Sequence, residues 1–250
     1  MSKYVASRIF SSLTDPRPWA LSRTLRSDNP ADLNGELKGT ATFVLNNTSN
    51  TPDGIRDMLY SEEGEMPGVG GSMAALRWTR KYIWRLSPSS FLTADEAGDI
   101  DITESPVEQA DGEHLSVWFV KLQKPASDSQ RGKEGSASEI EEAITNEVDY
   151  IFHELDIIQF DSTHADESLS ANAIIQPPPP PPPPPAVEES NTKVVIARGQ
   201  HLCINDHYQT VYAFRMGNDA PGRILSWSSR HMIRGPKKSQ EIVNLYSRDD

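Results

Sequence analysis

The stretch from His201 to Phe214 concentrates side chains that could do chemistry. Its residues alternate in character over two short runs that flank an Asn-Asp turn, which is the pattern of a β-hairpin. Because successive side chains of a strand point to opposite faces, His201 and Cys203 share one face. Cys203, Asp206 and His207 have the residue types of a nucleophilic catalytic triad. Asp206 and His207 fall in the predicted turn, where Asp is favoured for backbone reasons, so we reject this interpretation.

Two histidines offer a second kind of chemistry. His201 lies on the first strand of the hairpin, and His231 shares a face with Trp227 on a later strand. Imidazoles can bind metal or haem, or can transfer protons near neutral pH. They can equally be hydrogen-bonded core residues, and the sequence leaves these alternatives open. On the second strand of the hairpin, Tyr208 and Tyr212 share a face and are candidate wall residues of a pocket.

Arginines on otherwise apolar strand faces are the third candidate. On the predicted strand Leu76–Leu86, Arg80 lies in the middle of an aromatic face, and on Trp19–Leu25, Arg23 shares a face with leucines. A buried arginine is costly unless it is paired or binds an anion, so Glu62 is its natural counter-charge. The cluster could anchor an anionic ligand, or it could only close one end of a barrel. Its candidate ligand-binding members are Arg80, Arg23, Glu62, Tyr60, Tyr82 and Trp84.

Period-two alternation recurs along the chain and defines the elements that must position these side chains. One helix is predicted at Lys3–Leu13, where apolar residues recur at helical spacing. The rest is typical of an all-β sandwich or closed antiparallel barrel of about ten strands, forming a single domain over residues 1–250. The predicted strands are Trp19–Leu25, Glu36–Leu45, Met58–Glu63, Leu76–Leu86, Leu115–Leu122, Asp149–Ile158, Lys193–Ile204, Tyr208–Met216, Arg223–Ile233 and Glu241–Ser247.

Three polar segments interrupt the strands, and we expect them to be disordered insertions. Residues 87–113 are acidic and aperiodic, residues 123–146 are rich in Ser, Glu and Lys, and residues 164–192 contain nine consecutive prolines, Pro177–Pro185. Such a run forms an extended polyproline II rod. It could bind a groove of an SH3 or WW domain or of profilin, or it could be a stiff loop between two strands.

Net charge and cysteine content argue against several classes of function. The formal net charge of −12 disfavours nucleic acid and anionic membranes as partners. The single cysteine cannot form an intrachain disulfide, and the sequence has no signal-peptide pattern and no apolar span, so we expect a cytoplasmic protein. It has no HExxH, CxxC, Walker-type glycine loop or GxGxxG motif. Apart from the haem alternative, we therefore expect no cofactor and no metal.

Short motifs follow one another in order along nearly the whole chain. They are Trp19-x-Leu21-x-Arg23, Gly39-x-Ala41-x-Phe43, Tyr60-x-Glu62-x-Gly64, Arg80-x-Tyr82-x-Trp84, Phe152-His153-x-Leu155, His201-x-Cys203-x-x-Asp206-x-Tyr208, Gly235-Pro236-x-Lys238 and Tyr246-x-Arg248. In these motifs the chain resembles a family of small lipocalin-like (calycin-type) barrels, a domain of unknown function found in fungal and bacterial sequences. Two positions depart from that family's pattern: Pro18 stands where glycine is usual, and His231 stands where tryptophan is expected.

The resemblance implies a single lipocalin-like barrel that binds a small apolar or anionic ligand in its interior. It also implies a structural role for Trp19, which in lipocalins packs against an arginine of the last strand, here Arg248. We rank ligand binding first. The alternatives are a barrel enzyme of isomerase or cyclase type, with His201 as the proton-transfer group and Tyr208 or Glu62 as its partner, a haem-binding barrel, and an interaction protein that acts through the proline run.

Overall fold

The alternating segments fold into ten antiparallel strands. The computed structural model describes residues 4–46, 52, 54–66, 76–88, 112–121, 147–158, 175–218, 222–236 and 238–248. In chain order its elements are α1 (Val5–Leu13), β1 (Trp19–Ser27), β2 (Gly35–Leu45), β3 (Arg56–Met66), β4 (Leu76–Pro88), β5 (Glu113–Val120), β6 (Val148–Ile158), the short 3-10 helix η4 (Glu189–Asn191), β7 (Thr192–Cys203), β8 (Asp206–Gly217), β9 (Ile224–Arg234) and β10 (Ser239–Ser247).

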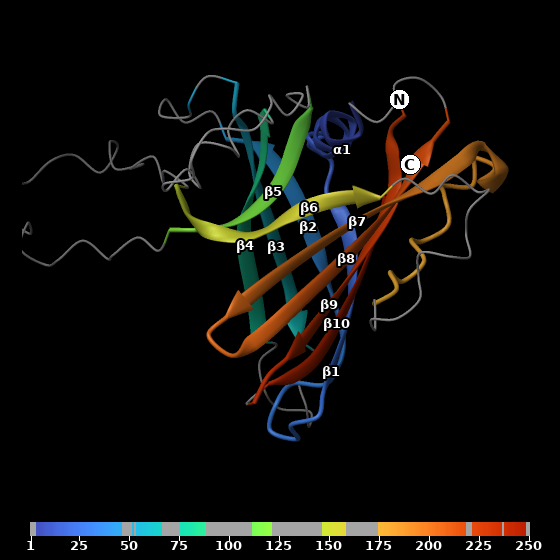
Figure 1. The fold of residues 1–250 in the computed structure, drawn as a ribbon. Coiled ribbons are helices and arrows are strands. Elements are labelled where there is room, and N and C mark those ends of the chain that lie inside the picture. Colours follow the sequence, from blue (N-terminus) through green and yellow to red (C-terminus); the bar gives the residue numbers. More distant parts are fainter. Residues whose placement is uncertain are drawn as a thin grey trace, which may run out of the picture.

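The sheet closes on itself. Each strand pairs with its neighbours in the chain, and β1 pairs with β10, with Ala20 opposite Ser247 and Ser27 opposite Gln240. Every strand therefore has a partner on both sides, although β6 and β7 pair over only three residues, with Asp156 opposite Arg198 and Ile158 opposite Ile196. The predicted fold class is confirmed: an all-β, closed antiparallel barrel of ten strands with one short N-terminal helix (Figure 1).

Aromatic side chains fill the interior at one end of the barrel. The rings of Trp227 and Tyr246 stack with their centroids 3.5 Å apart, and Phe43 packs against both Tyr60 and Trp84. Helix α1 covers this end and buries its apolar face, which consists of Ala6, Ile9, Phe10 and Leu13. This end of the barrel is therefore a packed core. Full burial of each large apolar side chain contributes about 1.5–3 kcal/mol to the stability of the fold.

Trp19 and Arg248 join the start of the barrel to its end. The Arg248 guanidinium carbon lies 3.8 Å from the centroid of a Trp19 ring. Its Nη2 also donates to the backbone carbonyls of Asp15 and Arg17, at 3.0 and 2.8 Å. The pairing that the resemblance implies is therefore present, and it fastens the segment between α1 and β1 to the residue that follows β10.

Of the predicted insertions, residues 89–111, 123–146 and 164–174 lie outside the described residues, whereas residues 87, 88 and 113 belong to β4 and β5. The proline run is different, because residues 175–185 are described and pack against the barrel. We expected disorder there because a proline run has no core of its own, but the outer surface of the barrel supplies one. Within the described part of the chain, no helix is both long enough and apolar enough to cross a membrane.

Candidate functional site

A cavity of about 410 Å³ lies inside the barrel, towards the end away from α1. Arg80, near the start of β4, and Gln240, near the start of β10, both line the cavity. Helix α1 lies at the opposite end of the barrel, where β4 ends and β9 begins. The cavity has the size of a site for a small organic molecule. All nine residues that we selected from the sequence line it: Arg23, Tyr60, Glu62, Arg80, Tyr82, Trp84, His201, Tyr208 and Tyr212.

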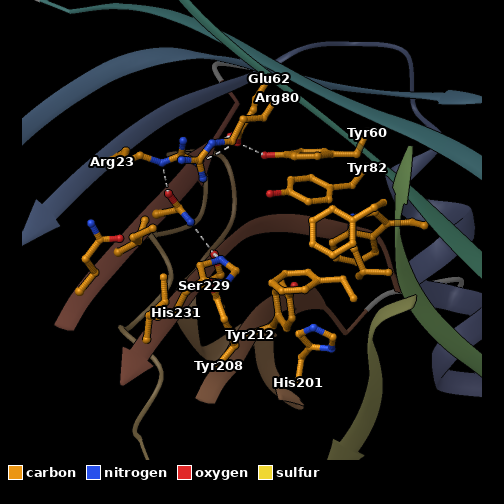
Figure 2. Close-up of a pocket in the computed structure, with 18 of the residues that line it drawn as sticks. Arg23, Tyr60, Glu62, Arg80, Tyr82, His201, Tyr208, Tyr212, Ser229 and His231 are labelled. Carbon is orange, nitrogen blue, oxygen red and sulfur yellow. Dashed lines mark hydrogen bonds and ion pairs between the residues drawn. The ribbon is translucent and has the colours of Figure 1, made fainter. Parts of the chain in front are cut away.

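Glu62 is the centre of the charged cluster in this cavity (Figure 2). The pairing of β3 with β4 places it directly opposite Arg80 and places Tyr60 opposite Tyr82. Its Oε2 accepts hydrogen bonds from Arg23 Nη2 at 2.7 Å and from the Tyr60 hydroxyl at 2.6 Å. Its Oε1 lies 3.9 Å from Arg80 Nε. Glu62 thus pairs with both arginines, in two different geometries.

The two arginines differ in depth. The Arg23 side chain is 5% exposed and that of Arg80 is 47% exposed. Burial disfavours the charged form of Arg23, but the Glu62 carboxylate more than compensates and raises the pKa of the guanidinium above its usual value. The sequence predicts a buried Arg80, and its side chain is half exposed instead. Alternation identifies its face correctly, but Arg80 sits close to the start of β4, where the barrel is open.

A chain of hydrogen bonds continues from Arg23 across the barrel wall. Arg23 Nε donates to Asn244 Oδ1 at 2.6 Å, and Asn244 Nδ2 donates to Ser229 Oγ at 2.8 Å. Neither Asn244 nor Ser229 was among the predicted site residues. The signal was present in β10, where Asn244 alternates with Ile242 and Tyr246 on one face, because a polar residue on an apolar strand face needs a partner.

His231 ends this chain and is held neutral. Its Nε2 lies 3.1 Å from Ser229 Oγ, and its Nδ1 lies 3.0 Å from Thr210 Oγ1. Burial lowers the pKa of His231 well below its usual value. Both ring nitrogens are occupied by hydroxyl groups, so the haem alternative would have to use His201. Among the described residues, no group of three or more His, Cys, Asp or Glu side chains could hold a metal ion.

His201 lies among aromatic rings instead of hydrogen-bonding groups. Its ring centroid is 5.9 Å from that of Phe152 and 6.0 Å from that of Tyr208. Within the described residues, no hydrogen bond connects it to Tyr208 or Glu62, the partners that an enzyme would need at this position. The geometry therefore gives His201 a place in the wall of the cavity.

His153 of β6 is buried and was not selected from the sequence as a site residue. His153 Nε2 lies 2.9 Å from the Tyr212 hydroxyl, and burial lowers the pKa of His153 to about 3. Its ring lies against Gly199 of β7, where any Cβ would overlap it. His153 thus fixes the position of the Tyr212 hydroxyl as a neutral hydrogen-bonding partner.

The hairpin turn differs by one residue from the prediction. The two turn residues are Ile204 and Asn205, so the predicted placement of Asp206 and His207 in the turn is wrong: both belong to β8, opposite Cys203 and Leu202. Ile204 has a φ of 58°, a conformation that a branched side chain rarely adopts, and it is exposed. Asp206 and His207 still lie at the tip of the hairpin on successive positions, so their side chains point to opposite faces.

Aromatic rings line the cavity beside the charged cluster and beyond it. Tyr82 stacks on Tyr60 and on Phe152, with centroid distances of 6.2 and 5.9 Å, and Trp84 meets Tyr212 edge-on at 5.6 Å. The cavity therefore combines an apolar surface with a charged surface. Among its described lining residues, Arg23, Arg80 and Lys238 carry positive charge and Glu62 carries negative charge.

These features define the class: an antiparallel β-barrel with an interior cavity lined by aromatic rings and by a charged cluster with an excess of positive charge. The chain matches a family of unknown function, DUF6314, over residues 17–125 and 186–248, which is more than half of its length. The protein belongs to that family. No curated protein and no solved structure matches the chain.

Proposed function

We propose that the protein is a lipocalin-like binding barrel for a small, mainly apolar molecule that carries a carboxylate or a similar anionic group. The observation that carries the proposal is the charge of the cavity. The described lining has three cationic side chains against one carboxylate, in a protein whose formal net charge is −12. An excess of positive charge inside a cavity attracts an anion, and because the protein as a whole is acidic, this positive charge is a local property of the site.

The two arginines would have different tasks. Arg23 is buried and already binds both Glu62 and Asn244, so it fixes the position of the carboxylate. Arg80 is half exposed, and its Nε is 3.9 Å from Glu62, beyond hydrogen-bonding distance. A planar guanidinium in this state can bind a ligand carboxylate through two hydrogen bonds. Arg80 is therefore the anchor, and Glu62 and Arg23 hold the wall behind it.

The remaining groups restrict what the ligand can be. The aromatic side chains Tyr82, Trp84 and Phe152 offer flat apolar surface to the body of the ligand. Glu62 Oε1 is buried and accepts no hydrogen bond from the described residues. A hydroxyl or amine group of the ligand, close to its anionic end, could donate to this oxygen. The cavity volume limits the ligand to the size of a small organic molecule.

A matched pair of ligands tests the anchor. Dodecanoate and dodecan-1-ol differ in charge at one end, and their binding can be followed by the fluorescence of Trp84 and Trp227, which line the cavity. Losing a hydrogen bond to a charged group costs about 1.5–3 kcal/mol. We therefore expect Arg80→Gln to weaken dodecanoate binding by roughly 10- to 100-fold and to leave dodecan-1-ol almost unchanged.

Arg77→Gln is the matched control, because Arg77 lies on the same strand, is exposed and pairs with Glu65 outside the cavity. It should change the binding of neither ligand. Equal loss of both ligands in Arg80→Gln would contradict the anchoring role, and dodecanoate binding that is unaffected by this substitution would contradict it as well.

A further inference from the structure

Strands β8 and β9 are buried on both faces, although a barrel strand needs to be buried only on its inner face. Tyr212 and Trp227 point inward, so by alternation Val211 and Ala213 of β8 and Ser226 and Ser228 of β9 point outward. These four outward residues are at most 1% exposed. The segment that covers them contains the proline run.

Hydrogen-bond donors on this outer face are matched to the run. Ser228 Oγ donates to the carbonyl of Pro178 at 2.6 Å, and Ser226 Oγ donates to the carbonyl of Pro181 at 2.5 Å. Arg215 Nε donates to the same Pro181 carbonyl at 3.1 Å. Proline has a carbonyl but no N–H, so a protein can form backbone hydrogen bonds to a proline run only by supplying donors.

The contacts also repeat with the period of the rod. The two accepting carbonyls are three residues apart, which is one turn of a polyproline II helix. Exposure follows the same step along the run: Pro179, Pro182 and Pro185 are exposed, whereas Pro178, Pro180 and Pro184 are buried and Pro181 is half-buried. One face of the rod therefore lies on the barrel and another faces solvent.

An apolar patch completes the site at the N-terminal end of the rod. Ile175 packs against Ile196, Val211 and Ala213, which form a cluster separate from the barrel core. The site thus provides aliphatic surface, two hydroxyl groups and a guanidinium on adjacent strands of a rigid sheet.

Arg215 is held in place by residues other than the rod. Its Nη1 donates to Thr192 Oγ1 at 3.1 Å and lies 3.0 Å from Glu189 Oε1. Arg215, Thr192 and Glu189 all lie within the family match, whereas the proline run lies in the unmatched interval between residues 125 and 186. The donors of the site therefore belong to the matched part of the barrel, and its occupant belongs to the unmatched part.

We propose that the outer face of β8 and β9 is a binding site for polyproline II segments, and that Pro177–Pro185 is the occupant that this chain supplies to itself. The docked rod has one face covered, so an SH3 domain, a WW domain or profilin would have to compete with the barrel for that face. Once the rod is released, the site is open to a proline run from another chain.

The experiment opens the site and offers the ligand on a separate peptide. In the opened chain, a Gly-Ser linker of equal length replaces residues 175–185. A labelled peptide of Ile-Gln followed by nine prolines is then titrated and followed by fluorescence anisotropy. We expect saturable binding to the opened chain. Binding to the intact chain should be at least about tenfold weaker, because a tethered competitor acts at millimolar effective concentration.

Two controls connect the binding to the proposed contacts. Ser226→Ala together with Ser228→Ala in the opened chain should abolish peptide binding, and a Gly-Ser peptide of equal length should not bind. If the opened chain retains its circular dichroism spectrum and fails to bind the peptide, the proposal is overturned. Equal binding by the intact and opened chains overturns it too.

A second measurement uses the full chain and does not depend on the folding of the opened one. A nitroxide label is attached at the exposed position 182, through Pro182→Cys in a Cys203→Ser background. Docking predicts slow label motion, and Ser226→Ala with Ser228→Ala should increase its mobility. Ser190→Ala, which removes an exposed hydroxyl bonded to Glu188, is the control and should leave the motion unchanged. A label that is equally mobile before and after the double substitution refutes the docked site.

Discussion

Replacing Glu62 with glutamine removes the negative charge on which two arginines depend. Glu62→Gln keeps the shape of the side chain and one acceptor oxygen, but it leaves Arg23, whose side chain is 5% exposed, without a counter-charge. Breaking a buried ion pair by changing one partner costs about 3–5 kcal/mol. Because the amide oxygen can still accept from Arg23 and Tyr60, we expect the lower end of this range, about 3 kcal/mol.

Urea unfolding followed by tryptophan fluorescence measures this loss. With a slope of about 2 kcal/mol per molar urea, a loss of 3 kcal/mol lowers the midpoint by about 1.5 M. Glu63→Gln is the matched control, because Glu63 is the next residue of β3 and is exposed on the outer face. A surface change of this kind should alter the free energy of unfolding by less than about 0.5 kcal/mol.

A double substitution measures the interaction between Glu62 and Arg23 apart from the cost of losing either side chain. Glu62→Leu combined with Arg23→Met removes both buried charges, and such replacements are often neutral when the volume is kept. The double variant should therefore lose less free energy of unfolding than the losses of Glu62→Leu alone and Arg23→Met alone add up to. The reasoning is refuted if Glu62→Gln costs less than about 1 kcal/mol, or if the losses of the two single substitutions are simply additive.

Two further predictions concern His153. Its folded pKa of about 3 lies below its ordinary value of 6.5, so as the pH falls the unfolded chain takes up the proton first. The stability of the fold is complete above pH 6.5 and falls between pH 6.5 and 3, by about 2 kcal/mol at pH 5. Urea midpoints at pH 7 and pH 5 measure this, and the drop should be smaller in His153→Gln; an unchanged drop would exclude His153 as its source. Gly199→Ala should lower the free energy of unfolding by about 1–3 kcal/mol, because its Cβ would overlap the His153 ring. The cost should shrink in a His153→Ala background, and an equal cost there would show that the ring is not the obstacle.

The strands and the helix could be predicted because they depend on local patterns. In β2, Leu37, Ala41 and Phe43 alternate with polar residues, and these three side chains are the buried ones. A period of two fits only a strand that is buried on one face. The helical spacing of Ile9 and Leu13 identifies the buried face of α1 in the same way.

The partners within the site could not be predicted in this way. The sequence predicts that Glu62 pairs with Arg23 or Arg80. Only the structure shows that Glu62 lies 2.7 Å from Arg23 and 3.9 Å from Arg80. The contact between His153 and Tyr212 joins β6 to β8 and leaves no trace in the alternation of either strand. Such contacts depend on how the barrel closes, which no short segment encodes.

For the proline run, too, the sequence predicts the local conformation but not the contacts. Its extended conformation follows from the sequence, because the proline ring fixes φ. Its position does not, since the donors Ser226 and Ser228 of β9 are separated from it by more than 40 residues, and Arg215 of β8 joins them only when β8 and β9 pair.

The sequence by itself determined which residues face the interior, because side-chain direction in a strand is a local property with a period of two. Only the tertiary structure decided how deep each of those residues lies. Arg23 and Arg80 both face inward, yet closure of the sheet buries the first and leaves the second at the open end. Depth along a barrel depends on the stagger of all ten strands, and this difference in depth is why the proposed function assigns ligand binding to Arg80 and a structural role to Arg23.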